Sequence, residues 1–103
     1  MVRVIKRMPL QRFWEKWPAA EQPLKDWYRD TRKARWRNFP DVKATFGQTD
    51  QAKVASGNTV AIFDIGGNKY RLIAKISYQK GKVYVLRVLT HKEYDAQNWK
   101  KQL

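Results

Sequence analysis

The segment from Thr59 to Leu89 constrains the fold more than any other part of the sequence. Thr59–Ile65 is apolar and partly β-branched, and Asn68–Tyr78 and Lys82–Leu89 follow it after short glycine-containing joints. Runs of this length and composition, separated by turn residues, are typical of antiparallel strands. We expect Gly66-Gly67 to supply the positive φ angles of a two-residue hairpin turn. The sequence therefore predicts a three-stranded meander.

Two amphipathic helices are expected before the meander. The apolar residues of the first lie at i, i+3, i+4 and i+7, the spacing of one helical face, and Pro18 ends it. Pro23 suits the first turn of the second helix, which has its own apolar stripe. The two stripes are Leu10, Phe13, Trp14 and Trp17, and Leu24, Trp27, Tyr28 and Ala34. These tryptophan-rich faces should cover one side of the sheet.

Three shorter elements complete the expected fold. Val2–Lys6 is rich in β-branched residues and should form a strand, Asn38–Asp41 has the composition of a helix start, and Ala52–Ala55 is a candidate for another strand. Helices followed by a meander are typical of an α+β domain. We expect residues 1–103 to form one such domain. Its N-terminal helices should pack on one face of a small, twisted, mainly antiparallel sheet, with a short helix at the C-terminal end.

The net charge indicates an acidic partner. Lys and Arg number 22 against 9 Asp and Glu, which gives +13, and the surplus is spread over both halves of the chain. Such a charge favours binding to a polyanion or an acidic protein. The chain has no cysteine, so disulfides and thiolate metal sites are excluded. No apolar run approaches the roughly 18 residues that span a bilayer. We therefore expect a soluble, cytoplasmic protein with no membrane partner.

Part of the positive charge lies on the second helix. One face of this helix and the residues after it carry several cations with only Asp30 opposing them: Arg29, Arg32, Lys33, Arg35 and Arg37. A charge run on a helix is often simply a solvated face. The alternative is a surface that meets nucleic acid or an acidic partner.

Alternation along the middle strand separates its two faces. One face, expected to meet the helices, is Tyr70, Leu72, Ala74, Ile76 and Tyr78, and the other is Lys69, Arg71, Ile73, Lys75 and Ser77. Arg87 interrupts the otherwise apolar last strand, and a buried guanidinium needs a partner. That partner is either the carboxylate of Asp64 or Glu93, or a bound phosphate, which arginine binds through a planar fork.

The end of the last strand combines a helix start with the one histidine of the chain. Thr90 and Glu93 have the spacing of a capping box, in which both side chains bond to backbone amides of the first turn. A helix N-terminus also suits a phosphate. His91 lies beside Lys92 and three residues before Tyr94. Histidine exchanges protons near neutral pH, so His91 is either a bystander or a group that transfers protons to and from a substrate.

Two segments carry a family resemblance: F-D-I-G-G-N-K-Y-R-L-I-A-K-I from Phe63, and V-L-T-H-K-E-Y-D from Val88 with Trp99 nearby. They resemble the HigB-type toxins of type II toxin–antitoxin modules, within the RelE-like superfamily. The resemblance covers about residues 36–100, including V-K-A-T-F-G from Val42. It implies a compact sheet with two packed helices and an mRNA endonuclease that usually acts on message in the ribosomal A site.

The resemblance also implies partners and site residues. The partner is a helix-turn-helix antitoxin, HigA-like, through whose complex alone operator DNA is bound. Asn68 and Arg71 occupy the G-N-x-x-R positions, and the T-H-x-E-Y-D positions are occupied by His91, Glu93, Tyr94 and Asp95. Relatives often have arginine where this chain has Leu86, followed by Arg87. A shift of one residue reverses the face, so Arg87 is the weaker candidate unless a bulge re-aims it.

RNA carries its own nucleophile, the 2′-OH. Cleavage therefore requires alignment of this group with the phosphorus, proton transfer, and stabilisation of charge on the phosphate. It does not require a metal or another cofactor. We assign Arg71 and Lys92 to charge stabilisation, and His91 or Tyr94 to proton transfer and base stacking, although Tyr94 is equally a candidate for packing. The expected RNA-binding residues are Asn68, Lys69, Lys75, Arg87 and Lys53. A non-catalytic basic module that binds RNA or the ribosome remains the alternative.

Overall fold

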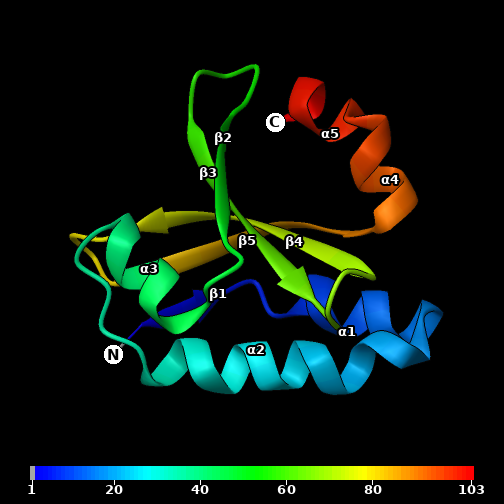
Figure 1. Cartoon of the computed structure of the whole chain (residues 1–103), viewed down its shortest axis with the longest axis horizontal. Coiled ribbons are helices and arrows are strands. Elements are labelled where there is room, and N and C mark those ends of the chain that lie inside the picture. Colours follow the sequence, from blue (N-terminus) through cyan, green and yellow to red (C-terminus); the bar gives the residue numbers. More distant parts are fainter. Residues whose placement is uncertain (1) are drawn as a thin grey trace.

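The computed structural model describes residues 2–103. The fold is built around one five-stranded sheet. The sheet order is β1-β5-β4-β3-β2. Along the chain the elements are β1 (Arg3–Ile5), α1 (Met8–Lys16), a 3₁₀ turn η1 (Pro18–Ala20), α2 (Glu21–Lys33), α3 (Phe39–Thr45), β2 (Asp50–Lys53), β3 (Thr59–Ile65), β4 (Tyr70–Ser77), β5 (Lys82–Thr90), α4 (His91–Ala96) and α5 (Asn98–Gln102). The expected α+β architecture is confirmed (Figure 1). Within residues 2–103, no helix has the length and apolar character needed to cross a membrane.

The meander is confirmed, but its first turn is longer than predicted. Ile65 pairs with Tyr70, so the loop contains four residues, 66–69, where a two-residue turn was expected. Gly66 and Gly67 do adopt positive φ angles, of 64° and 72°. Asn68 and Lys69 leave the ladder because they have other partners: the Asn68 side chain accepts from Arg71, and the Lys69 carbonyl accepts from the His91 amide. The turn is therefore tied to the start of α4.

Strands β2, β3, β4 and β5 pair with one another in antiparallel order. Strand β1, at the sheet edge, pairs parallel with β5. Val4 of β1 lies opposite Val83 of β5. A parallel pair needs a long crossover connection, and nearly the whole chain separates these two strands. The first and last strands in chain order are thus neighbours in the sheet.

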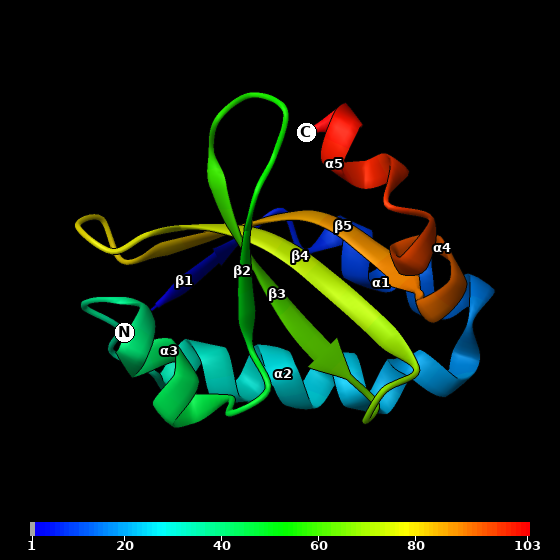
Figure 2. The ribbon, with the colours of Figure 1, turned by 45° about the horizontal axis from the view of Figure 1, so that its top comes forward.

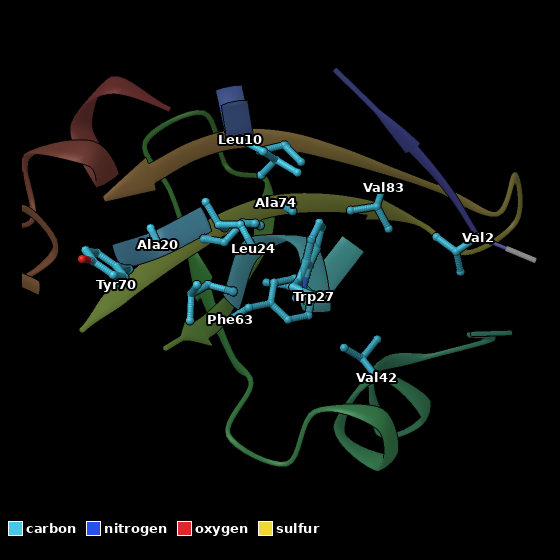
Figure 3. Packing of buried hydrophobic residues seen from close by; sticks show 14 of the residues in the cluster. Val2, Leu10, Ala20, Leu24, Trp27, Val42, Phe63, Tyr70, Ala74 and Val83 are labelled. Carbon is cyan, nitrogen blue, oxygen red and sulfur yellow. The ribbon is translucent and has the colours of Figure 1, made fainter. Parts of the chain in front are cut away.

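Helices α1 and α2 cover one sheet face, as expected (Figure 2). Leu24 and Leu72 are fully buried there. Figure 3 shows Leu24, Trp27 and Phe63 in this core, and the Phe63 ring packs against three other aromatic rings. The Phe63 ring is 5.3 Å from that of Trp27 and 5.5 Å from that of Phe46, both edge to face. Each such pair contributes about 0.5–1.5 kcal/mol beyond burial alone. This cluster fixes α2 and α3 on the sheet.

Two residues depart from the predicted helical stripes. Trp17 was expected on the core face, but α1 ends at Lys16 and Trp17 is 40% exposed. Its backbone is extended, with φ −124° and ψ 82°, because Pro18 follows. Thr31 is fully buried on α2 one turn after Trp27, although an apolar pattern does not predict a polar residue there. The other expected residues of the α2 stripe do contact the core.

The opposite sheet face carries a smaller core, which we name the second cluster: Val54, Val60, Ile62, Ile73 and Trp99. Helices α4 and α5 pack there (Figure 1). Trp99 is 2% exposed, and the Lys100 carbonyl accepts a 2.9 Å hydrogen bond from the Ala55 amide beside β2. The C-terminal helices are therefore anchored to the β2–β3 hairpin as well as to β5.

A β-bulge in β5 changes the direction of Arg87. Ile73 pairs with Arg87 whereas Ala74 pairs with Val85, so Leu86 is the extra residue. Val85 packs in the larger core and Leu86 packs against the second cluster. Because Arg87 is paired with Ile73, it lies on the same face as Ile73 and Arg71. In a regular strand, Arg87 would lie on the same helix-covered face as Val85. The bulge therefore places Arg87 on the opposite face, with Arg71.

The basic face of α2 is less free than the sequence suggested. Arg29 forms ion pairs with both Asp26 and Asp30, at 3.2 and 3.1 Å. Arg37 pairs with Asp41 at 3.1 Å. The prediction that only Asp30 opposes these cations was wrong, because Asp26 lies one turn before Arg29 and α3 brings Asp41 to Arg37. Arg29 and Arg37 thus belong to a solvated, paired surface.

Candidate active site

The candidate site lies where β4 begins and β5 ends, on the sheet face of the second cluster. Tyr70 pairs with Thr90, and the His91 amide donates a 3.0 Å hydrogen bond to the Lys69 carbonyl. The turn at residues 66–69 and the first turn of α4 are therefore adjacent. Asn68, Arg71, His91 and Tyr94, predicted from two separate motifs, meet in this region.

Arg71 is the most heavily engaged residue of the site. Its side chain is only 11% exposed, and its Nε lies 3.1 Å from Oδ1 of Asp64, the residue directly opposite on β3. Nη1 donates to the Tyr70 carbonyl at 3.2 Å, and Nη2 donates to Oδ1 of Asn68. The guanidinium carbon also lies 5.1 Å from the centroid of the Tyr94 ring. Arg71 therefore joins β3, the turn and α4.

Asp64 was one of the alternative partners considered for Arg87, and the structure contradicts it because the register places Asp64 opposite Arg71. Glu93, the other predicted partner, is engaged in the capping box: its Oε1 accepts from the Thr90 amide at 2.9 Å, and the Thr90 hydroxyl accepts from the Glu93 amide at 3.2 Å. The capping box is thus confirmed. Among residues 2–103, Arg87 has no carboxylate within ion-pair distance, and its Nη1 donates to the Leu86 carbonyl at 2.8 Å.

The capping box fixes the start of α4, and this places His91, Tyr94 and Asp95 on one helical face. Nδ1 of His91 lies 2.9 Å from Oδ2 of Asp95. An ionised carboxylate only accepts hydrogen bonds, so Nδ1 carries the hydrogen. In the neutral ring, Nε2 then has a free lone pair. The imidazole is 45% exposed, so this nitrogen is accessible to a substrate.

Tyr94 is held by packing on its ring and polar contact on its backbone. Its ring stacks on that of Trp99 at 5.5 Å and 14°, and Nε1 of Trp99 donates to the Tyr94 carbonyl at 3.1 Å. Burial raises the pKa of the Tyr94 hydroxyl above its ordinary value; Arg71 opposes this, and nearby carboxylates including Asp64 add to it. The hydroxyl therefore stays protonated at neutral pH, and the ring packs between Trp99 and the Arg71 guanidinium.

The predicted cations divide into near and distant groups. Lys69 in the turn and Lys92 in α4 are exposed at the site. Lys75 shares the face of Arg71 but lies four residues further along β4, about 13 Å away at the rise of a strand. Lys53 pairs with Thr59, and alternation places that pair on the helix-covered face. The structure therefore separates Lys53 from the site, because its neighbour Ala52 occupies the inward position on the other face.

Within residues 2–103, no group of three or more His, Asp and Glu side chains is arranged to hold a metal ion. The polar groups gathered at the site are one imidazole, one tyrosine hydroxyl, one side-chain amide, several cations, and the carboxylates of Asp64 and Asp95 that contact Arg71 and His91. This set can bind a phosphate group and exchange protons with it.

Comparison with known proteins identifies the same family that the sequence motifs resemble. Residues 20–97 match the family described as HigB_toxin, RelE-like toxic component of a toxin-antitoxin system. The chain belongs to the HigB toxin family. The mRNA interferase toxin HigB of Escherichia coli K12 is 30% identical over 94 residues, which cover 91% of this chain and 88% of that protein. The mRNA interferase HigB of Escherichia coli O6:H1 is 26% identical over 94 residues, covering 91% and 89%.

Membership of the HigB family means that this chain is the toxic component of a toxin–antitoxin pair and has an antitoxin as its partner. Sequence reasoning missed the role of Asp64 as the partner of Arg71 in this HigB-family chain. It also gave Asp95 no role, although Asp95 lies four residues after His91. That i, i+4 spacing on an expected helix was the available signal.

Proposed function

We propose that this HigB-family toxin is an endoribonuclease that cleaves mRNA and so inhibits translation and growth, with its active centre at His91, Lys92, Tyr94 and Arg71. The observation that carries the proposal is the convergence of the turn at residues 66–69 and the start of α4, tied by the hydrogen bond from the His91 amide to the Lys69 carbonyl. The names of the relatives, which describe mRNA interferases, support the same activity.

In the proposed reaction, the 2′-OH of one nucleotide attacks the adjacent phosphorus in line with the leaving 5′ oxygen. Nε2 of His91 accepts the 2′-OH proton, while the Asp95 carboxylate, 2.9 Å from Nδ1, stabilises the resulting imidazolium. The Tyr94 hydroxyl, which is protonated at neutral pH, would protonate the leaving oxygen. An exchange of these roles would require an ionised Tyr94 and a protonated His91 at the start of the reaction, and the raised pKa of Tyr94 opposes this.

Charge on the phosphate is stabilised by cations that have no internal carboxylate. Lys92, Lys69 and Arg87 meet this condition within the described residues 2–103. Arg71 differs, since Asp64 neutralises it and two of its five N–H groups donate to the protein. We infer that Arg71 mainly positions Asn68 and Tyr94, with a smaller direct contribution to charge stabilisation than the sequence suggested.

The proposal includes several finer features that follow from the family resemblance. The message would be cleaved in the ribosomal A site, in the cytoplasm, and without a metal ion. The antitoxin would be a HigA-like helix-turn-helix protein, and the toxin would reach operator DNA only within their complex. Lys75 would contact RNA that extends beyond the active centre along β4.

Primer extension on a translated message tests the activity. We expect the purified chain to produce discrete cuts with ribosomes present, and His91→Ala to lower the cleavage rate at least about 100-fold. Lys80→Ala, an exposed cation in the β4–β5 turn, is the matched control and should cleave normally. Parallel reactions without ribosomes and with EDTA test the ribosome and metal requirements. RNA binding without any cleavage by the wild-type chain would refute the enzyme and support the basic RNA-binding alternative.

A further inference from the structure

A second candidate surface lies on the outer side of the helical layer. A groove of about 520 Å³ runs between α1 and α2, and its lining residues are Arg7, Met8, Leu10, Gln11, Trp14, Lys25 and Tyr28. Helices α1 and α2 cover the sheet face opposite to that of Tyr94 and Trp99. Figure 1 shows α1 and α2 below the sheet and α4 and α5 above it. The groove is therefore separate from the proposed active centre.

Four of the seven residues that line this groove are apolar or aromatic. Leu10 is buried at its floor, Trp14 and Tyr28 are partly buried, and the Met8 side chain is 57% exposed. A flexible methionine next to aromatic rings adapts readily to the apolar side chains of another protein. Exposed apolar surface with a polar rim is characteristic of protein contact sites.

The rim of the groove is cationic. The guanidinium groups of Arg7 and Arg32 lie 4.6 and 5.5 Å from the centroid of the same Tyr28 ring. Neither arginine has a carboxylate within ion-pair distance among residues 2–103. Two unpaired guanidiniums held beside an apolar groove complement a segment that combines carboxylates with apolar side chains.

The aromatic rings in the groove are not free for base stacking. Arg7 and Arg32 contact the Tyr28 ring, and Nζ of Lys25 lies 5.4 Å from the Trp14 ring centroid. Recognition of single-stranded RNA by aromatic surfaces depends on open ring faces. The cations therefore favour a protein partner over RNA at this surface.

We propose that the α1–α2 groove is the docking site for an acidic amphipathic helix of the antitoxin. Apolar side chains on one face of that helix would fill the space around Met8 and Trp14, while its carboxylates would pair with Arg7 and Arg32. Membership of a toxin–antitoxin family supplies the partner. The proposal does not depend on the nuclease activity, because binding and cleavage are measured separately.

Isothermal titration calorimetry with the antitoxin encoded beside the toxin gene tests this. We expect Arg7→Glu/Arg32→Glu in the full chain to raise Kd at least about 30-fold, since attraction becomes repulsion at two positions. Lys43→Glu/Lys80→Glu is the matched control: it makes the same charge change on exposed lysines of α3 and the β4–β5 turn, and should change Kd less than about threefold. Met8→Asp should also weaken binding, while Met8→Leu should not.

Circular dichroism of each variant verifies folding before titration. Equal losses of affinity in the groove variant and the charge-matched control would mean that net charge alone attracts the antitoxin, and would overturn the proposal. Unchanged affinity in the groove variants would place the antitoxin elsewhere, and would also overturn it. If the groove variants instead lost affinity for single-stranded RNA and kept that for the antitoxin, the groove would be an RNA surface.

Discussion

Arg71 has a role that depends on the shape of its side chain as well as on its charge. Asp64, Asn68 and the Tyr94 ring each contact a different part of the planar guanidinium. A lysine ammonium is compact and lacks this fork, so it cannot make these contacts together. The positions of the turn and of α4 should therefore depend on arginine at this position.

We predict that Arg71→Lys lowers the cleavage rate about 10- to 100-fold while the chain stays folded, because small displacements of the reacting groups are costly. Single-turnover cleavage and circular dichroism check this. A wild-type rate for Arg71→Lys would mean that only the charge matters. Asp64→Asn should leave Arg71 without its counter-ion and destabilise the fold by about 2 kcal/mol in urea unfolding.

Asp95 provides a second prediction at a single residue. Because it orients the His91 ring, Asp95→Asn should lower kcat about tenfold and leave KM unchanged. Both side chains are about half exposed, and such ion pairs contribute little to stability, so Tm should not change. A drop in Tm with unchanged kcat would instead indicate that the pair only supports the helix.

The pairing of Asp64 with Arg71 was the part of the candidate site that the sequence did not predict. Alternation placed Arg71 on the correct face, and the cap residues Thr90 and Glu93 were recognised from their spacing. The partner of Arg71 was missed because it depends on turn length. A two-residue turn would have put Asp64 opposite Lys69, whereas the four-residue turn puts it opposite Arg71. Tertiary contacts of Asn68 and Lys69 select the longer turn, and no local pattern encodes them.

At the scale of elements, β5 shows a related difficulty. Its core-facing residues Val85 and Val88 are three positions apart instead of two, since the bulge adds Leu86. In the sequence this reads as an ordinary apolar run, so the direction of Arg87 was left open. The docking of α5 was equally hard to foresee, because a five-residue helix has almost no periodic pattern.

Two tryptophans allow a controlled test of that docking. Trp99 is 2% exposed in the second cluster, whereas Trp17 is 40% exposed after α1. Trp99→Ala should destabilise the chain by about 3 kcal/mol, as expected for truncating a buried aromatic side chain, and Trp17→Ala by less than about 1 kcal/mol. Urea unfolding measures both. Because Tyr94 stacks on Trp99, cleavage by Trp99→Ala should also be slower under native conditions. Equal destabilisation would contradict the docking.

At the scale of the whole molecule, the charge of +13 governs encounter with RNA. Each phosphate contact with single-stranded RNA contributes about 0.7 to the slope of log K against log salt. We predict that Lys69→Ala/Lys92→Ala makes this slope shallower by about 1.4, while Lys80→Ala leaves it nearly unchanged. Fluorescence anisotropy of a labelled oligonucleotide between low and physiological salt measures the difference. Equal slopes would place the RNA away from α4.

The pairing of β1 with β5 has a consequence for synthesis of the protein. Strand β1 precedes the other strands in the chain, yet among residues 2–103 its sheet neighbour is β5, the last of the five in sequence. The sheet therefore cannot close until about residue 90 has emerged from the exit tunnel, and His91 and Tyr94 follow directly. Because α4 follows β5, the proposed active centre cannot assemble on a growing chain until both elements have been synthesised.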